Sequence, residues 1–218
     1  VITNMGTVYR FLGQLDKAME IQQEALRIHR LVNGDGSEDV AIALGNIGNS
    51  FFERGRHAEA RGNYEEALGI YRRLHGEKHP SVASVLGSIG NILSKQGEYD
   101  EALKLYRKAL KIRRHVYGDD HRVVADTLKN LGLALCGQGK QGEYVEVFEE
   151  AVGVYSRVLG VDNEHNAVIY YDIALAKDRS GDVAGALESA RESVRIYDKL
   201  GITDQDVTDL LMRLEGIE

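Results

Sequence analysis

Residues 79–118 read HPSVASVLGSIGNILSKQGEYDEALKLYRKALKIRRHVYG, and this stretch shows how the chain is built. Its first half carries apolar residues at helical spacing, as in Leu86, Ile89 and Leu93. Its second half is periodic in the same way, and Gly97 lies between the two halves. The stretch therefore predicts a hairpin of two helices joined by a short turn.

The same pattern returns every 42 residues along the chain. Glycine recurs at this spacing in three columns and a small residue in a fourth, so chance is excluded. The columns are Gly6, Gly48, Gly90 and Gly132; Gly13, Gly55, Gly97, Gly139 and Gly181; Gly34, Gly76, Gly118 and Gly160; and Ala25, Ala67, Ala109, Ala151 and Ser193.

The glycine columns have two different interpretations. Those that begin at Gly13 and Gly34 follow periodic stretches, and glycine there can adopt the left-handed conformation that ends a helix. The column that begins at Gly6 lies within a helix, where glycine costs about 1 kcal/mol relative to alanine. We expect a close helix crossing to offset this cost, with a second small residue opposite each glycine. The opposing column is Ala18, Ala60, Ala102 and Ala186.

Tyr144 interrupts this small column in the fourth unit. A large ring at a close crossing typically costs about 1–3 kcal/mol unless the backbone shifts. We therefore predict that the fourth repeat is a weak joint, and that its second helix starts late to make room for the ring.

The decisive stretch resembles the tetratricopeptide repeat. The segments that carry the resemblance are Leu86-Gly-Ser-Ile-Gly90, Gln96-Gly-Glu-Tyr-Asp-Glu-Ala102 and Tyr106-Arg-Lys-Ala-Leu-Lys-Ile112. The usual unit has about 34 residues, whereas the 42-residue unit here is similar to the kinesin light chain type. The resemblance covers essentially the whole chain. It implies an all-α, right-handed superhelical solenoid of antiparallel helical hairpins, with a concave groove that holds peptide segments of partner proteins.

We expect a single array over residues 1–218 that forms part of a longer protein. The predicted repeats are about 1–36, 37–78, 79–120, 121–162 and 163–202, with a final capping helix at about 205–215. The predicted helices are 1–12, 15–33, 38–54, 57–75, 80–96, 99–117, 122–138, 141–159, 164–180 and 183–200.

Composition narrows the classes of partner and the cellular location that we expect. The formal net charge of −7 has the wrong sign for a protein that follows phosphate backbones, so we expect no nucleic-acid partner. A single cysteine suits a reducing compartment and a cytoplasmic location. No apolar run approaches the roughly 20 residues of a membrane span, so we expect no membrane insertion.

The resemblance implies that the first helix of each hairpin lines the groove. The residue just before the Ile or Leu of the Leu-x-x-Ile/Leu-Gly motif then points into it, and the residue three positions later lies on the same face. A carboxamide there suits a bound peptide, because it offers a donor and an acceptor to the peptide backbone. The alternative is a solvated polar face. The predicted partner-binding residues are Asn4, Thr7, Asn46, Asn49, Ser88, Asn91, Lys95, Lys129, Asn130 and Asp172.

Other functions receive less support from the sequence. His79 and His121 fall at matching loop positions, which favours packing or helix-start hydrogen bonds over a metal site. Cys136 has no paired histidine near it in sequence, so we expect no catalytic residue, and no phosphate-loop motif indicates a cofactor. An enzyme would need a convergent cleft of titratable residues, which the repeat does not show. Self-association through the array ends, where Ile2, Met5 and Tyr9 would be uncovered, remains an alternative.

Overall fold

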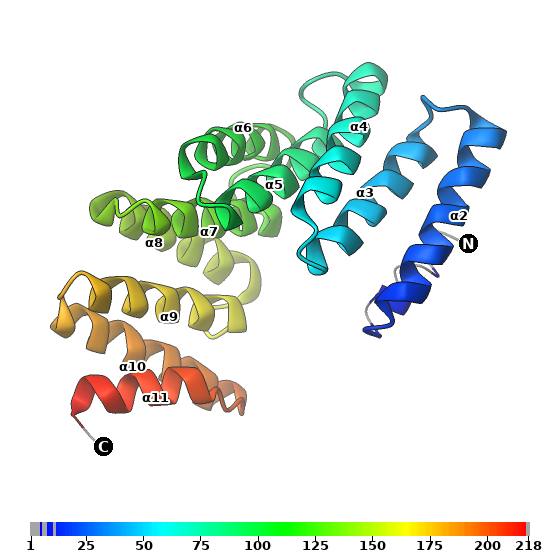
Figure 1. The fold of residues 1–218 in the computed structure, drawn as a ribbon. Coiled ribbons are helices and arrows are strands. Elements are labelled where there is room, and N and C mark those ends of the chain that lie inside the picture. The colour runs from blue at the N-terminus through cyan, green and yellow to red at the C-terminus, as the bar shows by residue number, and fades with distance from the viewer. Residues whose placement is uncertain (1–4, 6–7, 11, 217–218) are drawn as a thin grey trace. The chain divides into compact units, whose positions relative to one another are not determined.

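The structure is a computed structural model that describes residues 5, 8–10 and 12–216, and this part of the chain consists of helices joined by short loops (Figure 1). The chain divides into two compact units, Val1–Gln96 and Gly97–Glu218. The helices of the first unit are α2 (Leu15–Asn33), α3 (Glu38–Glu53), α4 (His57–His75) and α5 (Pro80–Lys95). Those of the second are α6 (Tyr99–Tyr117), α7 (Arg122–Gly137), α8 (Gln141–Leu159), α9 (Glu164–Arg179), α10 (Val183–Leu200) and α11 (Gln205–Glu215).

These bounds confirm the all-α fold and nearly every predicted helix end. The second helix of each described hairpin has the predicted limits. The first helix of each hairpin from α3 onward ends one residue before its predicted end, as α3 does at Glu53. The single array over residues 1–218 stays a prediction.

Within each unit, helices that follow one another in the chain pack side by side. In the first unit α3 lies between α2 and α4, and α4 also packs against α5. In the second, each helix from α6 to α11 packs against the next. The packed residues are apolar or small, and Leu44, Tyr64, Leu128 and Phe148 are all at most 3% exposed. No helix in the described residues is both long and apolar enough to cross a membrane.

The first helix of each hairpin starts at a side-chain cap. Ser37, His79, His121 and Asn163 occupy one column of the repeat, and each accepts a hydrogen bond from a backbone N–H in the first turn. In the two histidines the acceptor is Nδ1, at 3.3 Å from Ser81 N and at 3.2 Å from the Val123 nitrogen. The predicted helix-start role of His79 and His121 is therefore confirmed.

The second helices end at glycine, as predicted. Gly76 has φ 79° and ψ 176°, and its N–H bonds the carbonyl of Arg72. This ψ differs from the left-handed helical value that we expected, and the combination is open essentially to glycine alone. Gly34, Gly118 and Gly160 share the conformation, with φ between 79° and 90°.

Two glycines within the first helices face aromatic rings. A Cβ added to Gly48 would lie 2.6 Å from Cε1 of Tyr64, and one added to Gly132 would lie 2.6 Å from the same atom of Phe148. The crossing is close, as expected, but the atoms nearest to Gly48 belong to Tyr64 rather than to Ala60, and those nearest to Gly132 belong to Phe148 rather than to Tyr144. A flat ring fills the space that the missing side chain leaves.

Tyr144 is accommodated without a late helix start. Helix α8 begins at Gln141, in register with the other second helices, so this part of the prediction is wrong. The Tyr144 ring is 3% exposed and packs edge-on against Phe148, with ring centroids 6.0 Å apart. Its hydroxyl oxygen is buried and finds no hydrogen-bond partner among the described residues.

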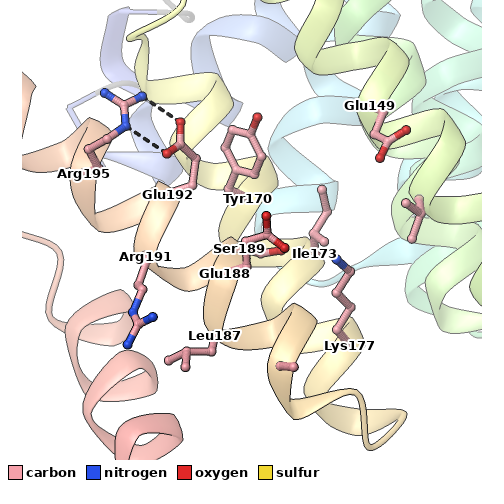
Figure 2. Close-up of a pocket in the computed structure, with 12 residues that line it drawn as sticks. Glu149, Tyr170, Ile173, Lys177, Leu187, Glu188, Ser189, Arg191, Glu192 and Arg195 are labelled. Atoms are coloured by element: carbon pink, nitrogen blue, oxygen red, sulfur yellow. Dashed lines mark hydrogen bonds and ion pairs between the residues drawn. The ribbon is translucent and has the colours of Figure 1, made fainter.

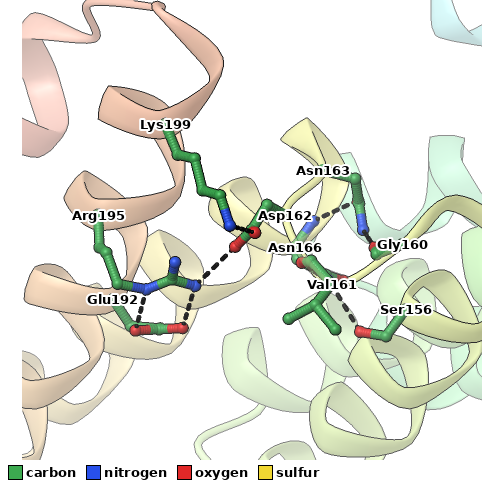
Figure 3. A network of polar contacts seen from close by, with 9 residues as sticks. All are labelled: Ser156, Gly160, Val161, Asp162, Asn163, Asn166, Glu192, Arg195 and Lys199. Atoms are coloured by element: carbon green, nitrogen blue, oxygen red, sulfur yellow. Dashed lines mark hydrogen bonds and ion pairs between the residues drawn. The ribbon is translucent and has the colours of Figure 1, made fainter.

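A polar network holds the loop between α8 and α9 (Figure 3). Asn163 donates to the carbonyl of Gly160 at 2.6 Å, and Asn166 donates to Ser156 Oγ and to the carbonyl of Val161, both at 2.9 Å. Next to them, Asp162 forms ion pairs with Lys199 and Arg195 of α10. Both cations lower the pKa of the Asp162 carboxyl. These contacts fix the start of α9 against the end of α10.

Candidate functional site

The helices α3, α5, α7 and α9 each have one narrow face that neighbouring helices cover only in part, which we call the exposed stripe. It comprises four positions, spaced four, three and four residues apart, so they share one side of the helix. In the first unit the stripe is Ile42, Asn46, Asn49 and Glu53 on α3, and Ser84, Ser88, Asn91 and Lys95 on α5. In the second it is Asp126, Asn130, Leu133 and Gly137 on α7, and Val168, Asp172, Leu175 and Arg179 on α9.

Asn46 and Asn130 occupy the same register position on α3 and α7. Both side chains are half-buried, and neither forms a hydrogen bond within the described part of the chain. A carboxamide in this setting keeps two donors and its oxygen acceptor free for an external group. These two residues therefore have the properties expected of residues that bind a peptide.

Asn49 has a partner inside the hairpin. The buried hydroxyl of Tyr64 donates to Asn49 Oδ1 at 2.6 Å. Burial raises the pKa of Tyr64 to about 12, and the nearby Ser88 side chain opposes this rise. Asn49 satisfies a hydroxyl that the packing buries, and only its amide donors remain for a ligand.

The other predicted residues of the first unit differ in whether they already interact with groups of the protein. Lys95 is exposed at the end of α5 and forms no ion pair within the described residues. Asn91 is half-buried and is engaged in an interaction within the protein. Asn4 and Thr7 lie outside the described residues.

In the second unit, the stripe carries an acidic group among cations. Burial raises the pKa of Asp172 to about 6, while Lys129 of α7 and Arg179 of α9 oppose the rise. Neither cation forms a close ion pair with this carboxylate or with any other described acid. Asp172 can therefore accept a hydrogen bond from a ligand above about pH 6 and donate one below it.

Cys136 lies near this acidic group, half-buried on α7. Burial raises the pKa of its thiol, so the nucleophilic thiolate is disfavoured. No group of three potential metal ligands occurs within the described ranges. The chemistry of the stripe is that of a recognition surface with hydrogen-bonding groups and mixed charge.

Sequence reasoning missed a pocket on another side of the second unit (Figure 2). It has a volume of about 830 Å³ and is lined by residues of α8, α9 and α10. The signal was present in the sequence, because Tyr170 and Lys177 occupy columns that hold leucine in the two preceding repeats.

Comparison with family models gives overlapping matches along most of the chain. A model described as tetratricopeptide repeat matches residues 1–73, 39–115 and 81–143. A second model with the same description matches residues 124–165. A comparison with curated protein sequences finds no match.

Solved structures with the same fold share little sequence with this chain. A putative kinesin light chain with nearly identical TPR-like repeats from Podosopora anserina has a TM-score of 0.76 at 18% identity, covering 91% of this chain and 94% of its own. BtubC (BKLC) from P. vanneervenii has a TM-score of 0.75 at 18% identity, with 93% and 85% covered. YrrB, described as a TPR protein with an unusual peptide-binding site, has a TM-score of 0.55 at 17% identity, with 89% and 84% covered.

Proposed function

We propose that this chain, which belongs to the tetratricopeptide repeat family and has the long repeat of the kinesin light chain type, binds extended peptide segments of partner proteins on its exposed stripes. The family fold is a protein-interaction scaffold and is generally not enzymatic. The exposed stripe is the proposed surface and an extended peptide the proposed ligand, for each unit taken by itself.

The free carboxamides of Asn46 and Asn130 carry the proposal. Both recur at one register position, on helices whose other faces are packed against neighbours. An extended peptide presents N–H and C=O groups at regular intervals, and a carboxamide pairs with either. A ligand backbone is therefore the natural partner for these groups.

Each unit adds its own charge to this backbone recognition. In the first, Lys95 offers a free ammonium group at the end of the α5 stripe. In the second, Lys129 precedes Asn130 in the chain and interacts electrostatically with Asp172 of α9, and the exposed Leu133 adds an apolar contact. We expect the second unit to select peptides with an apolar residue near mixed charge.

The test is selection of binding peptides from a random displayed library, followed by affinity measurement on variants. Asn46→Ala is applied to peptides that bind the first unit, and Asn130→Ala to peptides that bind the second. Each change removes one or two hydrogen bonds of roughly 0.5–1.5 kcal/mol, so affinity should fall by about two- to 150-fold.

The matched control is Gln23→Ala, which removes an exposed carboxamide from the second helix of a hairpin. It should leave affinity unchanged. Selected peptides that bind both asparagine variants at full strength would show that the stripes are not the binding surface.

Self-association is a second candidate function. Five large apolar side chains near the start of the described chain are between 46% and 74% exposed: Met5, Val8, Leu12, Leu31 and Val32. Such a surface favours burial against another molecule. Light scattering at increasing concentration tests this function, which requires mass to grow with concentration.

A further inference from the structure

The pocket between α8, α9 and α10 lies entirely within the second unit. Its volume of about 830 Å³ falls in the range of pockets that hold a ligand or a short peptide segment. Val145, Ile173 and Leu187 give it apolar walls, and charged side chains surround these walls. Figure 2 shows the Arg195–Glu192 pair at one end of the pocket, Glu149 at the other, and the Tyr170 ring between them.

The pocket occurs where the repeat departs from its own pattern. Tyr170 stands in the column of Leu128, which is 1% exposed, and Lys177 stands in the column of Leu135, which is also 1% exposed. Tyr170 and Lys177 are both only half-buried and line the pocket. Two core leucines are thus replaced by side chains with an apolar body and a polar end, which suit a wet binding site.

The charges around the pocket are not all neutralised. Arg195 is paired with Glu192, at 2.7 Å, and with Asp162, and Arg191 is paired with Glu215 at 2.8 Å. Glu149, Glu188 and Lys177 form no ion pair within the described residues. The unpaired groups are therefore two carboxylates and one ammonium, which leaves a net negative charge.

The pocket and the exposed stripe lie on opposite sides of α9. A helix turns by about 100° per residue, so Tyr170, Ile173 and Lys177 are centred about half a turn away from Asp172 and Arg179. A ligand in the pocket would leave the stripe free. The two surfaces can be tested separately.

We propose that this pocket binds an arginine side chain of a partner protein segment. The guanidinium group lies between the carboxylates of Glu149 and Glu188, which match its several N–H donors. Its planar group stacks on the ring of Tyr170.

The rest of the segment uses the remaining walls of the pocket. The methylene stem of the arginine packs on Ile173 and Leu187, and neighbouring apolar side chains occupy the remaining volume. The ammonium group of Lys177 donates hydrogen bonds to the peptide carbonyls.

The test is NMR titration of the full chain, labelled at its isoleucine, leucine and valine methyl groups. The probes are three capped tripeptides at millimolar concentration: N-acetyl-Leu-Arg-Leu-amide and its counterparts with Gln or Glu at the centre. The arginine peptide should shift the methyl signals of Ile173 and Leu187, and the other two should not. Glu149→Gln combined with Glu188→Gln should weaken this binding roughly tenfold or more, because both carboxylates are lost.

The matched control is Glu146→Gln, which removes a charge from the same helix one turn away and outside the pocket. It should retain nearly full affinity. Equal shifts with the glutamine peptide, no shift with any peptide, or unchanged affinity in the double variant would overturn the proposal. Shifts confined to Leu133 and Leu175 would also overturn it and would place the peptide on the exposed stripe, so the two proposals fail separately.

Discussion

The hairpins α3/α4 and α7/α8 share a backbone arrangement, and one difference between their sequences concerns the ring that packs on a glycine and the residue beside that glycine. In both, a glycine of the first helix lies under a ring of the second: Gly48 under Tyr64, and Gly132 under Phe148. Only the first ring carries a hydroxyl group. The side chain that follows each glycine differs accordingly, with Asn49 in one hairpin and Leu133 in the other.

This difference shows what the asparagine does. Asn49 accepts the hydrogen bond of the buried Tyr64 hydroxyl, whereas Phe148 presents no hydroxyl group and needs no acceptor. The hairpin α9/α10, with Ala190 in place of the ring, again has leucine at the equivalent position, Leu175. A polar residue on the exposed stripe can thus belong to the packing beneath it.

The largest expected effect concerns the close approach of ring and glycine. Gly48→Ala and Gly132→Ala should each lower the free energy of unfolding by about 1–3 kcal/mol, because the new methyl group would overlap a buried ring. Denaturant unfolding measures the loss.

The control for that loss lies on the same helix. Gly45→Ala adds a methyl group in open space and should raise stability by about 0.5–1 kcal/mol through helix propensity. A loss of stability at Gly45 as large as that at Gly48 would contradict the role of the ring.

The next prediction transfers the side-chain pair of the α3/α4 hairpin to the α7/α8 hairpin. Phe148→Tyr places a hydroxyl group beside Leu133 without an acceptor and should cost about 1–3 kcal/mol. Adding Leu133→Asn should recover roughly 0.5–1.5 kcal/mol of it, by restoring the bond seen between Tyr64 and Asn49. A double-mutant cycle by chemical denaturation measures this coupling, and additive costs would show that the pair is not transferable.

A smaller expected effect is a pH dependence of stability at the stripe of α9, caused by Asp172. The pKa of Asp172 is raised from 3.8 to about 6 in the folded chain, so its ionisation opposes folding. Stability contributed by this group is therefore lost as the pH rises from about 4 through 6. Asp172→Asn should stabilise the chain by roughly 1 kcal/mol above pH 6, after allowance for solvent screening, and should have no such effect near pH 4.

Ser88, which holds the equivalent position on α5, supplies the comparison for this titration. Ser88→Ala should give a stability change that does not vary between pH 4 and pH 7. Thermal unfolding across this range measures both variants, and a pH-independent effect of Asp172→Asn would contradict the perturbed titration.

The smallest effect distinguishes two asparagines of one helix. Asn46→Ala removes a carboxamide without an internal partner and should change stability by less than about 0.5 kcal/mol. Asn49→Ala leaves the Tyr64 hydroxyl without its acceptor and should cost about 1 kcal/mol or more. Equal losses in denaturant unfolding would remove the distinction between a free and an engaged stripe residue.

The sequence by itself determined the fold, because the local features that specify one helical hairpin recur in each repeat. Helix periodicity, the glycines at helix ends and the caps at His79 and His121 are local properties, and each unit repeats them with few changes. The helix limits followed almost to the residue. Where a unit departs from the pattern, as at Tyr144, local rules were insufficient: they indicated a shifted helix start, but the ring is buried within a regular helix.

The tertiary structure alone decided which polar residues are free. Asn46 and Asn49 are three residues apart on one helix face and look alike in the sequence, yet the ring of another helix engages only one of them. The pocket beside Tyr170 and Lys177 likewise depends on which charges of α10 find partners in the α8–α9 loop and in α11. Hydrogen bonds and ion pairs of this kind join residues far apart in sequence, and the repeat pattern specifies helices without specifying these pairings.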